Sequence, residues 1–277
     1  MSHTRNLLLS LSVAAGGMTG CAEAPMPVRA ASDLPPAGES RVPMRIGYVP
    51  PVRVDRFDEA VVRVSHPDTS CSGTLIEPDL VLTAHHCVAS RGPRGEFLPS
   101  LVDPNALRIE LGGDHFAWDE VRIRAVIAPP CGERGGDGDV AVLVLSRKLV
   151  GFPTAKLLLD HSPERGETVD PIGFGRCTYS RGPSHRYLRE GGPIDEVRGG
   201  AFRLQAAVCP GDSGGPAVQR GTMRVLGVVS MSAMDADEST RSTSIFSRVD
   251  RFRNVVSHAR MIADSTSASE LPPLSCE

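Results

Sequence analysis

The octapeptide from Cys209 to Pro216 reads C-P-G-D-S-G-G-P, and it decides which fold the rest of the chain must form. Glycines on both sides of Ser213 let the backbone turn tightly, so that two amide groups can point at one oxygen atom. A serine hydroxyl is a poor nucleophile at neutral pH, because it needs a base within hydrogen-bond reach to take its proton. The stretch therefore predicts a nucleophilic serine and requires a base elsewhere in the chain.

A candidate base lies in Leu82 to Val88, which reads L-T-A-H-H-C-V and sets two histidines before a cysteine. A zinc site made by His85, His86 and Cys87 is disfavoured, because adjacent residues do not easily converge on one tetrahedral ion and no second pair with metal spacing follows. We therefore expect neither a metal nor a cofactor. The apolar stretch D-V-A-V-L-V-L starts at Asp139 and offers a carboxylate directly before a buried strand.

These three stretches together closely resemble the motifs of the chymotrypsin- and trypsin-like serine peptidases. Further matches are C-S-G-T-L-I from Cys71, G-F-G from Gly173 and I-F-S-R-V from Ile245. The order His, Asp, Ser along the chain is also the order of this family. The resemblance covers the chain from Ile46 onward and implies a serine endopeptidase that works through an acyl-enzyme on protein or peptide substrates.

The resemblance also assigns the site. The family's base directly precedes the cysteine of its T-A-A-H-C run, so His86 is the expected base and His85 is a packed bystander. Ser213 would be the nucleophile, and Asp139 would orient and compensate the imidazolium, as in the general scheme for such triads. Asp137 is the rival carboxylate, but it lies in a Gly-rich loop with no apolar strand directly behind it. The amides of Gly211 and Ser213 would form the oxyanion hole.

Substrate specificity follows from the same resemblance in outline. The family's pocket base lies six residues before the nucleophile, at Ala207, so no carboxylate attracts arginine or lysine there. Ser232 and Ser244 replace wall positions that are often glycine and would narrow the pocket. We therefore expect cleavage after small or medium apolar residues. Ser230 to Ser232 would pair with the substrate as an added antiparallel strand, with Met231 at a position that is usually aromatic.

Two further predictions concern activation and disulfide bonds. In activated members of the family, cleavage creates a new amino terminus that reaches the aspartate beside the nucleophile. Cleavage after Arg45 could bring Ile46 to Asp212 in the same way. The sequence after this cut is I-G-Y-V, however, and differs from the usual I-V-G-G. The resemblance pairs Cys71 with Cys87. It leaves Cys177 with Cys209 and Cys131 with Cys276 as the proposed remaining bonds, since spacing alone does not fix the connectivity.

The residues themselves predict an all-β fold. Short β-rich runs alternate with turn residues, and only the tail from Arg251 to Ala263 has helical spacing of its apolar side chains. Many strands at this spacing fit a sandwich or a pair of barrels, and the resemblance to the chymotrypsin-like peptidases implies two six-stranded antiparallel β-barrels with a C-terminal helix. The first barrel would span about 46–150 and the second about 151–262, within a peptidase domain of 46–277. Examples of these β-rich runs are 60–64, 73–76, 80–83, 107–111, 121–127, 140–145, 168–173, 217–218, 224–230 and 244–249.

The amino-terminal residues predict export. Residues 1–20 have a positive start and a short apolar stretch, as in a signal peptide, and M-T-G-C up to Cys21 resembles the lipobox of bacterial lipoproteins. Seven cysteines leave one unpaired in an oxidising compartment, and lipidation of Cys21 would account for it. Residues 21–45 are Pro-rich and read as a tether or propeptide. We expect a cell-envelope lipoprotein or a secreted protein, attached to a membrane only through lipid.

Composition narrows the partners. The chain has 277 residues with 40% apolar side chains, enough for an enzyme-sized core. Lys plus Arg (30) nearly balance Asp plus Glu (33), and without a basic run nothing points to nucleic acid. We expect a monomer that binds proteins or peptides.

Two other readings remain. G-D-S-G-G also satisfies the nucleophile elbow of α/β-hydrolases, with Asp235, Asp237 or Asp250 and then His258 in that family's order. An elbow must lead into a helix, however, and Ser213 is followed by Gly214, Gly215, Pro216 and a β-rich hairpin. A catalytically idle binding module on a peptidase scaffold is the second reading, although such relatives normally lack a triad residue.

Overall fold

The computed structural model describes residues 57–67, 69–112, 117–130, 132, 134–177, 185–232 and 241–275. All of them belong to one unit, Gly47–Glu277. The expected signal peptide, the tether, Cys21, Ile46, Cys131 and Cys276 lie outside the described residues. Within those residues, no helix has the length and apolar character needed to cross a membrane.

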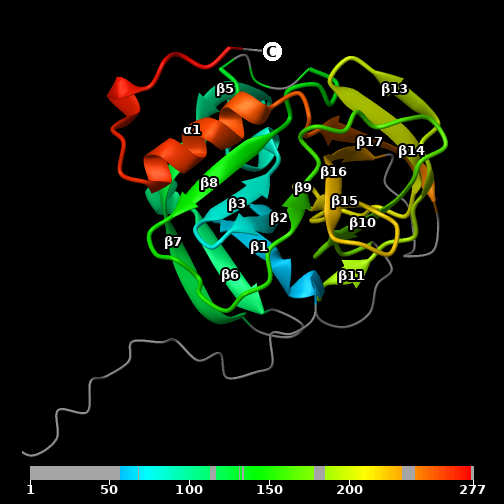
Figure 1. Cartoon of the computed structure of the whole chain (residues 1–277), viewed down its shortest axis with the longest axis horizontal. Coiled ribbons are helices and arrows are strands. Elements are labelled where there is room, and N and C mark those ends of the chain that lie inside the picture. Colours follow the sequence, from blue (N-terminus) through cyan, green and yellow to red (C-terminus); the bar gives the residue numbers. More distant parts are fainter. Residues whose placement is uncertain are drawn as a thin grey trace, which may run out of the picture. The chain divides into compact units, whose positions relative to one another are not determined.

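The first half forms a closed antiparallel barrel in the order β1–β2–β3–β8–β7–β6 (Figure 1). Its strand β8 (Ala141–Leu145, A-V-L-V-L) has all five side chains buried, which explains its continuous apolar sequence. The pairing of β1 with β6 closes the barrel. The other strands are β1 (Val61–His66), β2 (Thr69–Glu77), β3 (Leu80–Thr83), β6 (Arg108–Gly112) and β7 (Ala117–Ile127).

The expected all-β fold with a barrel and a C-terminal helix is confirmed, and in its second half the strands form a nine-stranded sheet rather than a regular six-stranded barrel. Seven strands follow the order β11–β10–β15–β16–β17–β14–β13, with β12 paired to β10 and β9 paired in parallel to β16. Its strands are β9 (Lys156–Leu157), β10 (Thr168–Gly173), β11 (Tyr187–Leu188), β12 (Gly192–Pro193), β13 (Glu196–Arg198), β14 (Ala201–Ala206), β15 (Pro216–Gln219), β16 (Arg224–Ser232) and β17 (Ser242–Arg248).

The reason for this difference is the irregular segment around β12. The amide of Ala207 donates to the Glu190 carbonyl at 2.9 Å, and the amide of Asp195 donates to the Arg203 carbonyl at 2.8 Å. These single bonds bring the end of β14 next to the segment that pairs with β10. The sheet therefore curls toward closure through short, broken pairings and not through a long sixth strand.

Smaller elements cover the barrel. The hairpin β4 (Ala89–Arg91) and β5 (Phe97–Leu101) follows the short 3₁₀ helix η3 (His85–Cys87). The expected C-terminal helix is present as α1 (Arg253–Ala263), which packs on β8, β7 and β3 through buried Val255, Val256 and Ala259 (Figure 1). The remaining 3₁₀ helices are η2 (Phe57–Ala60), η4 (Pro104–Ala106) and η5 (Ala268–Glu270).

Two apolar cores hold these halves. One fills the barrel and extends under α1. The other lies in the second sheet, where the rings of Phe202 on β14 and Phe246 on β17 stack with centroids 5.2 Å apart. Each half thus has its own packed interior, and the polar residues described next lie where the two halves meet.

Candidate active site

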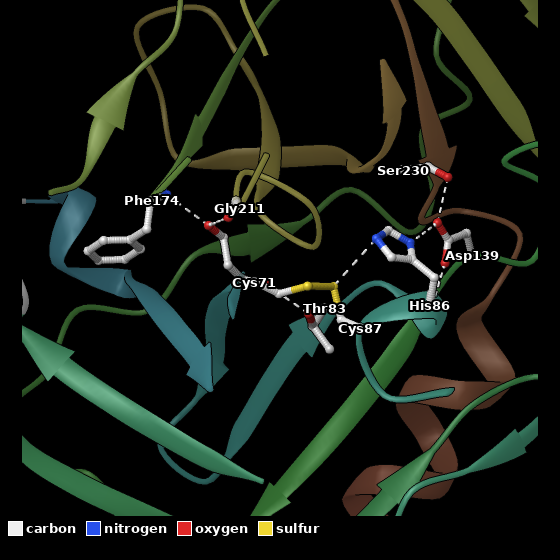
Figure 2. The surroundings of a disulfide bond; sticks show 9 residues. Cys71, Thr83, His86, Cys87, Asp139, Phe174, Gly211 and Ser230 are labelled. Atoms are coloured by element: carbon white, nitrogen blue, oxygen red, sulfur yellow. Dashed lines mark hydrogen bonds and ion pairs between the residues drawn. A yellow bond between two sulfur atoms is a disulfide. The ribbon is translucent and has the colours of Figure 1, made fainter. Parts of the chain in front are cut away.

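His86 is held by a carboxylate through two of its own groups. Its ring Nδ1 lies 2.7 Å from Asp139 Oδ2, and its backbone amide donates to Asp139 Oδ1 at 2.9 Å. Because a carboxylate only accepts hydrogen bonds, Nδ1 donates its proton in this contact. Figure 2 shows the ring between Asp139 and the Cys71–Cys87 disulfide bond, with Nε2 3.7 Å from Cys87 Sγ. The arrangement fixes the orientation of the His86 ring and turns Nε2 away from Asp139.

Asp139 is fully buried directly before β8 and accepts from three donors. These are the two groups of His86 and the hydroxyl of Ser230 on β16 (Figure 2). Burial by itself raises the pKa of the Asp139 carboxyl, but the bond and charge of His86, then the Ser230 hydroxyl, more than offset it, so that this pKa lies below the ordinary aspartate value. The rival Asp137 is exposed and accepts instead from the Gly200 amide at 3.0 Å.

The loop that carries Ser213 is shaped by glycine. Gly211 and Gly214 have φ values of +99° and +82°, which side chains rarely tolerate. A Cβ at Gly214 would collide with Thr83 Oγ1 and the Ser72 carbonyl. The loop is tied to β2, because the Ser72 amide donates to the Ser213 carbonyl at 2.7 Å and the Ser72 hydroxyl donates to the Gly211 carbonyl at 2.7 Å.

Ser213 and His86 line the same cleft, whose volume is about 550 Å³. In the described part of the chain, their side chains make no direct hydrogen bond. The amides of Gly211 and Ser213 donate to no acceptor among the described residues, so they are available to an oxygen atom in the cleft. The arrangement can support proton transfer from a serine hydroxyl with two amide donors nearby.

Comparison with known proteins identifies the family. The Trypsin family profile matches residues 55–256, which is most of the described chain. The chain belongs to the trypsin family of serine peptidases. The identification agrees with the barrel, the terminal helix and the residues around the cleft.

Individual relatives are distant. The chain is 27% identical over 198 residues to a cercarial protease of Schistosoma mansoni, covering 58% of this chain and 70% of that protein. It is 30% identical over 168 residues to a peroxisomal leader peptide-processing protease of Mus musculus, covering 59% of this chain but only 26% of the relative. Neuropsin, a serine protease expressed in the limbic system of mouse brain, has a similar fold, with a TM-score of 0.53 at 18% identity over 73% of this chain and 95% of neuropsin.

The predicted substrate-binding residues of this trypsin-family chain divide into two groups. Ser230, Met231 and Ser232 line the cleft. Ala207 and Ser244 are fully buried and are not part of its wall. The Ser232 hydroxyl lies 2.9 Å from the Ser244 hydroxyl, so Ser232 at the cleft is hydrogen-bonded to a buried serine behind it.

The cysteines near the cleft are cross-linked. Cys71 is bonded to Cys87 with a Cα–Cα distance of 6.1 Å, and Cys177 is bonded to Cys209 at 5.0 Å. Cys71, His86 and Cys87 place potential metal donors together, but sulfurs in a disulfide bond supply no thiolate to an ion. His85 is buried, with 1% of its surface exposed.

The elbow reading does not fit this fold. Ser213 leads through a turn into β15 and not into a helix. His258 lies on α1, where its two ring nitrogens are each 2.8 Å from a backbone carbonyl, those of Asn254 and Pro272. Both ring nitrogens of His258 are therefore engaged by backbone carbonyls, one in α1 and one in the terminal segment.

Sequence reasoning missed four residues around the cleft. Ser72 holds the serine loop, and the Ser230 side chain holds Asp139, although only the Ser230 backbone was expected to act. Phe97 is 41% exposed, and its ring centroid lies 5.3 Å from that of His86 at the cleft. Arg189 pairs with buried Asp212 at 2.8 Å. Burial raises the pKa of the Asp212 carboxyl, and Arg189 with two backbone amides opposes the rise.

The G-F-G motif has a structural reason that the sequence did not reveal. A side chain at Gly173 or Gly175 would collide with Asp212. Both positions therefore leave space for the carboxylate beside Ser213, which explains why a motif almost forty residues earlier belongs to the same site.

Proposed function

We propose that the protein is a serine endopeptidase in which Ser213 is the nucleophile, His86 the general base and Asp139 the residue that orients His86. The observation that carries the proposal is the 2.7 Å bond between His86 Nδ1 and Asp139 Oδ2, in a cleft that Ser213 also lines. It leaves a basic nitrogen on the ring and a buried negative charge behind it, which are the two requirements for activating a hydroxyl.

The reaction proceeds in two halves. As Ser213 Oγ attacks the peptide carbonyl carbon, its proton moves to His86 Nε2, and the amides of Gly211 and Ser213 donate to the developing oxyanion. The imidazolium then gives the proton to the leaving amine, the C–N bond breaks and an acyl-enzyme remains. Water attacks the ester carbonyl while His86 accepts its proton, and the return of this proton to Ser213 releases the acid.

The preferred residue before the cut bond is small or medium and apolar. No carboxylate lines the cleft in the described part of the chain, and Ser232, which lines the cleft and is hydrogen-bonded to the buried Ser244, occupies space where a glycine would leave room. Substrate residues further from the cut bond would pair with the backbone of Ser230 to Ser232 on β16.

A fluorophosphonate probe tests this function, because only an activated serine reacts with it. We expect labelling of the wild-type chain at Ser213, no labelling of Ser213→Ala and strongly reduced labelling of His86→Ala. Hydrolysis of a p-nitroanilide panel should favour Ala and Val over Arg. A wild-type chain that is properly folded but neither labelled nor active would instead support the idle binding module, and fastest cleavage after Arg would overturn the pocket assignment.

Export and lipidation of Cys21 form part of the proposal. The two disulfide bonds of the described residues support an oxidising compartment. Expression in a bacterial host with labelled palmitate should give a labelled protein, whereas Cys21→Ala should be secreted without label. If both forms are exported without label, residues 1–20 act as an ordinary signal peptide and Cys21 is not lipidated.

A further inference from the structure

A buried ion pair lies directly behind the loop that carries Ser213. Arg189 Nε is 2.8 Å from Asp212 Oδ2, and the side chains are 2% and 0% exposed. A second guanidinium nitrogen of Arg189 lies 3.3 Å from Asp212 Oδ1 and also donates to the Gly175 carbonyl. The guanidinium carbon is 4.5 Å from the ring centroid of Tyr187 on β11. Arg189 is thus fixed on several sides and is not a surface side chain that happens to reach inward.

The Asp212 carboxylate is enclosed by backbone amides and by the Arg189 guanidinium. Oδ1 accepts from the Gly175 amide at 2.7 Å and from a terminal nitrogen of Arg189 at 3.3 Å, while Oδ2 accepts from the Cys209 amide at 2.9 Å and lies 2.8 Å from Arg189 Nε in an ion pair. A carboxylate has about four lone-pair positions; three hydrogen bonds occupy positions here, and the Arg189 guanidinium covers the remaining side of Oδ2 as an ion pair. An ammonium group arriving from Ile46 would have to displace the guanidinium or an amide.

The pair also connects the segments that shape the candidate oxyanion hole. Asp212 joins Cys209, at the start of the loop, to Gly175, and Gly211 and Ser213 are its immediate neighbours. A buried carboxylate without a cation is strongly destabilising, and Arg189 is the one cation that pairs with Asp212 among the described residues. Without Arg189, the loop would have to move so that Asp212 could reach water.

We infer that Arg189 is a positioning residue that holds the Ser213 loop in its working conformation, so that no new amino terminus at Ile46 is required. The inference rests on the proposed function for its kinetic consequence. It makes the enzyme competent without cleavage after Arg45, and it replaces the switch between Ile46 and Asp212 that the sequence suggested. Cleavage in that segment would then change release or location and not activity.

The test uses the full chain with three substitutions. Arg189→Met removes the charge at similar length, Arg189→Lys restores a charge without the planar fork, and Arg45→Gln blocks cleavage after Arg45. Arg186→Met is the matched control. The Arg186 side chain is equally buried, pairs with Glu59 at 3.0 Å and lies over the Phe174 ring. Among the described residues its hydrogen bonds go to Val61, Glu59 and Gly112, and none goes to the loop from Cys209 to Gly214.

We expect Arg45→Gln to stay uncut by mass spectrometry and to keep the wild-type kcat/KM. Arg189→Met should lower kcat roughly 100-fold, comparable to the loss of one oxyanion donor, with a much smaller change in KM. Arg189→Lys should recover part of kcat, and Arg186→Met should keep kcat even where its melting temperature falls. An unchanged kcat in Arg189→Met, or activity that appears only after cleavage before Ile46, overturns the inference while leaving the peptidase function intact.

Hydrogen exchange gives a readout that does not depend on catalysis. In Arg189→Met, amides of residues 209–215 should exchange at least tenfold faster than in the wild type, and in Arg186→Met they should not. If the wild-type chain proves inactive, the proposed function fails, yet the exchange data still decide whether Arg189 orders the loop. Equal exchange in both variants rejects the inference in either case.

Discussion

Replacing Ser230 by alanine tests whether the buried acid of the site is held by both halves of the fold. Ser230→Ala removes one of the three donors to Asp139 and leaves both bonds from His86 in place. A hydrogen bond to a charged group contributes about 1.5–3 kcal/mol. We expect a loss of about 2 kcal/mol in the free energy of unfolding at pH 7, which corresponds to a fall of about 4–8 °C in melting temperature for a chain of this size.

The pH dependence has a definite sign. The pKa of Asp139 is lowered in the folded protein, so the carboxylate stabilises the fold above the unfolded value of about 4 and loses this contribution as pH falls through the folded pKa. Without the Ser230 hydroxyl, the folded pKa moves back toward the ordinary value. The difference in stability between parent and variant should therefore shrink to about 1 kcal/mol at low pH, where only a neutral hydrogen bond is lost.

The assay is urea unfolding followed by circular dichroism between pH 3 and pH 7, with intact disulfide bonds and in a Ser213→Ala background that prevents self-cleavage. Ser247→Ala is the matched control, because Ser247 is also buried and its hydroxyl has no hydrogen-bond partner in the described part of the chain. It should show little loss and no pH dependence. The reasoning is refuted if the Ser230→Ala variant is as stable as its parent at pH 7, or if its loss of stability is the same at pH 3 and at pH 7.

Three further predictions concern catalysis and specificity. Asp139→Asn should keep the fold by circular dichroism but lower kcat by on the order of 10⁴, because an amide favours the wrong tautomer of His86; a loss under tenfold would contradict this role. Phe97→Ala should raise KM about fivefold, equivalent to about 1 kcal/mol of lost apolar contact, with little change in kcat in steady-state assays. Combining Ser232→Gly with Ser244→Gly should increase the preference for a Phe over an Ala p-nitroanilide roughly tenfold, and an unchanged ratio would place the pocket elsewhere.

The sequence predicted the barrel better than the second sheet. All six barrel strands coincide with expected runs, because their buried side chains form apolar stretches such as A-V-L-V-L at Ala141. Strand β14 was missed, although A-F-R-L-Q-A alternates buried and exposed side chains along its whole length. Arg203 and Gln205 face outward and break the apolar run, so a search for continuous apolar residues overlooks it. Period-two alternation was the signal that could have found it.

The buried polar contacts of the site were not predictable in the same way. Arginine is almost never fully buried unless it is paired, and nothing around Arg189 distinguishes it from the many surface arginines of the chain. Its partner Asp212 could be singled out from its place beside Ser213. The cation that pairs with Asp212, however, is set by the antiparallel pairing of β11 with β10, which brings Arg189 next to the loop. No sequence pattern predicts this pairing.

The separation of these contacts along the chain explains how the two halves come to be aligned at the site. Ser230 on β16 reaches Asp139 before β8, across 91 positions, and Ser72 on β2 reaches Gly211, across 139 positions. Each contact satisfies a buried polar group on one half with a donor from the other, and an unsatisfied buried group is costly. A shift between the halves would leave Asp139 short of a donor and detach the serine loop from β2. The same bonds that orient His86 and Ser213 therefore also fix the register of the barrel against the second sheet.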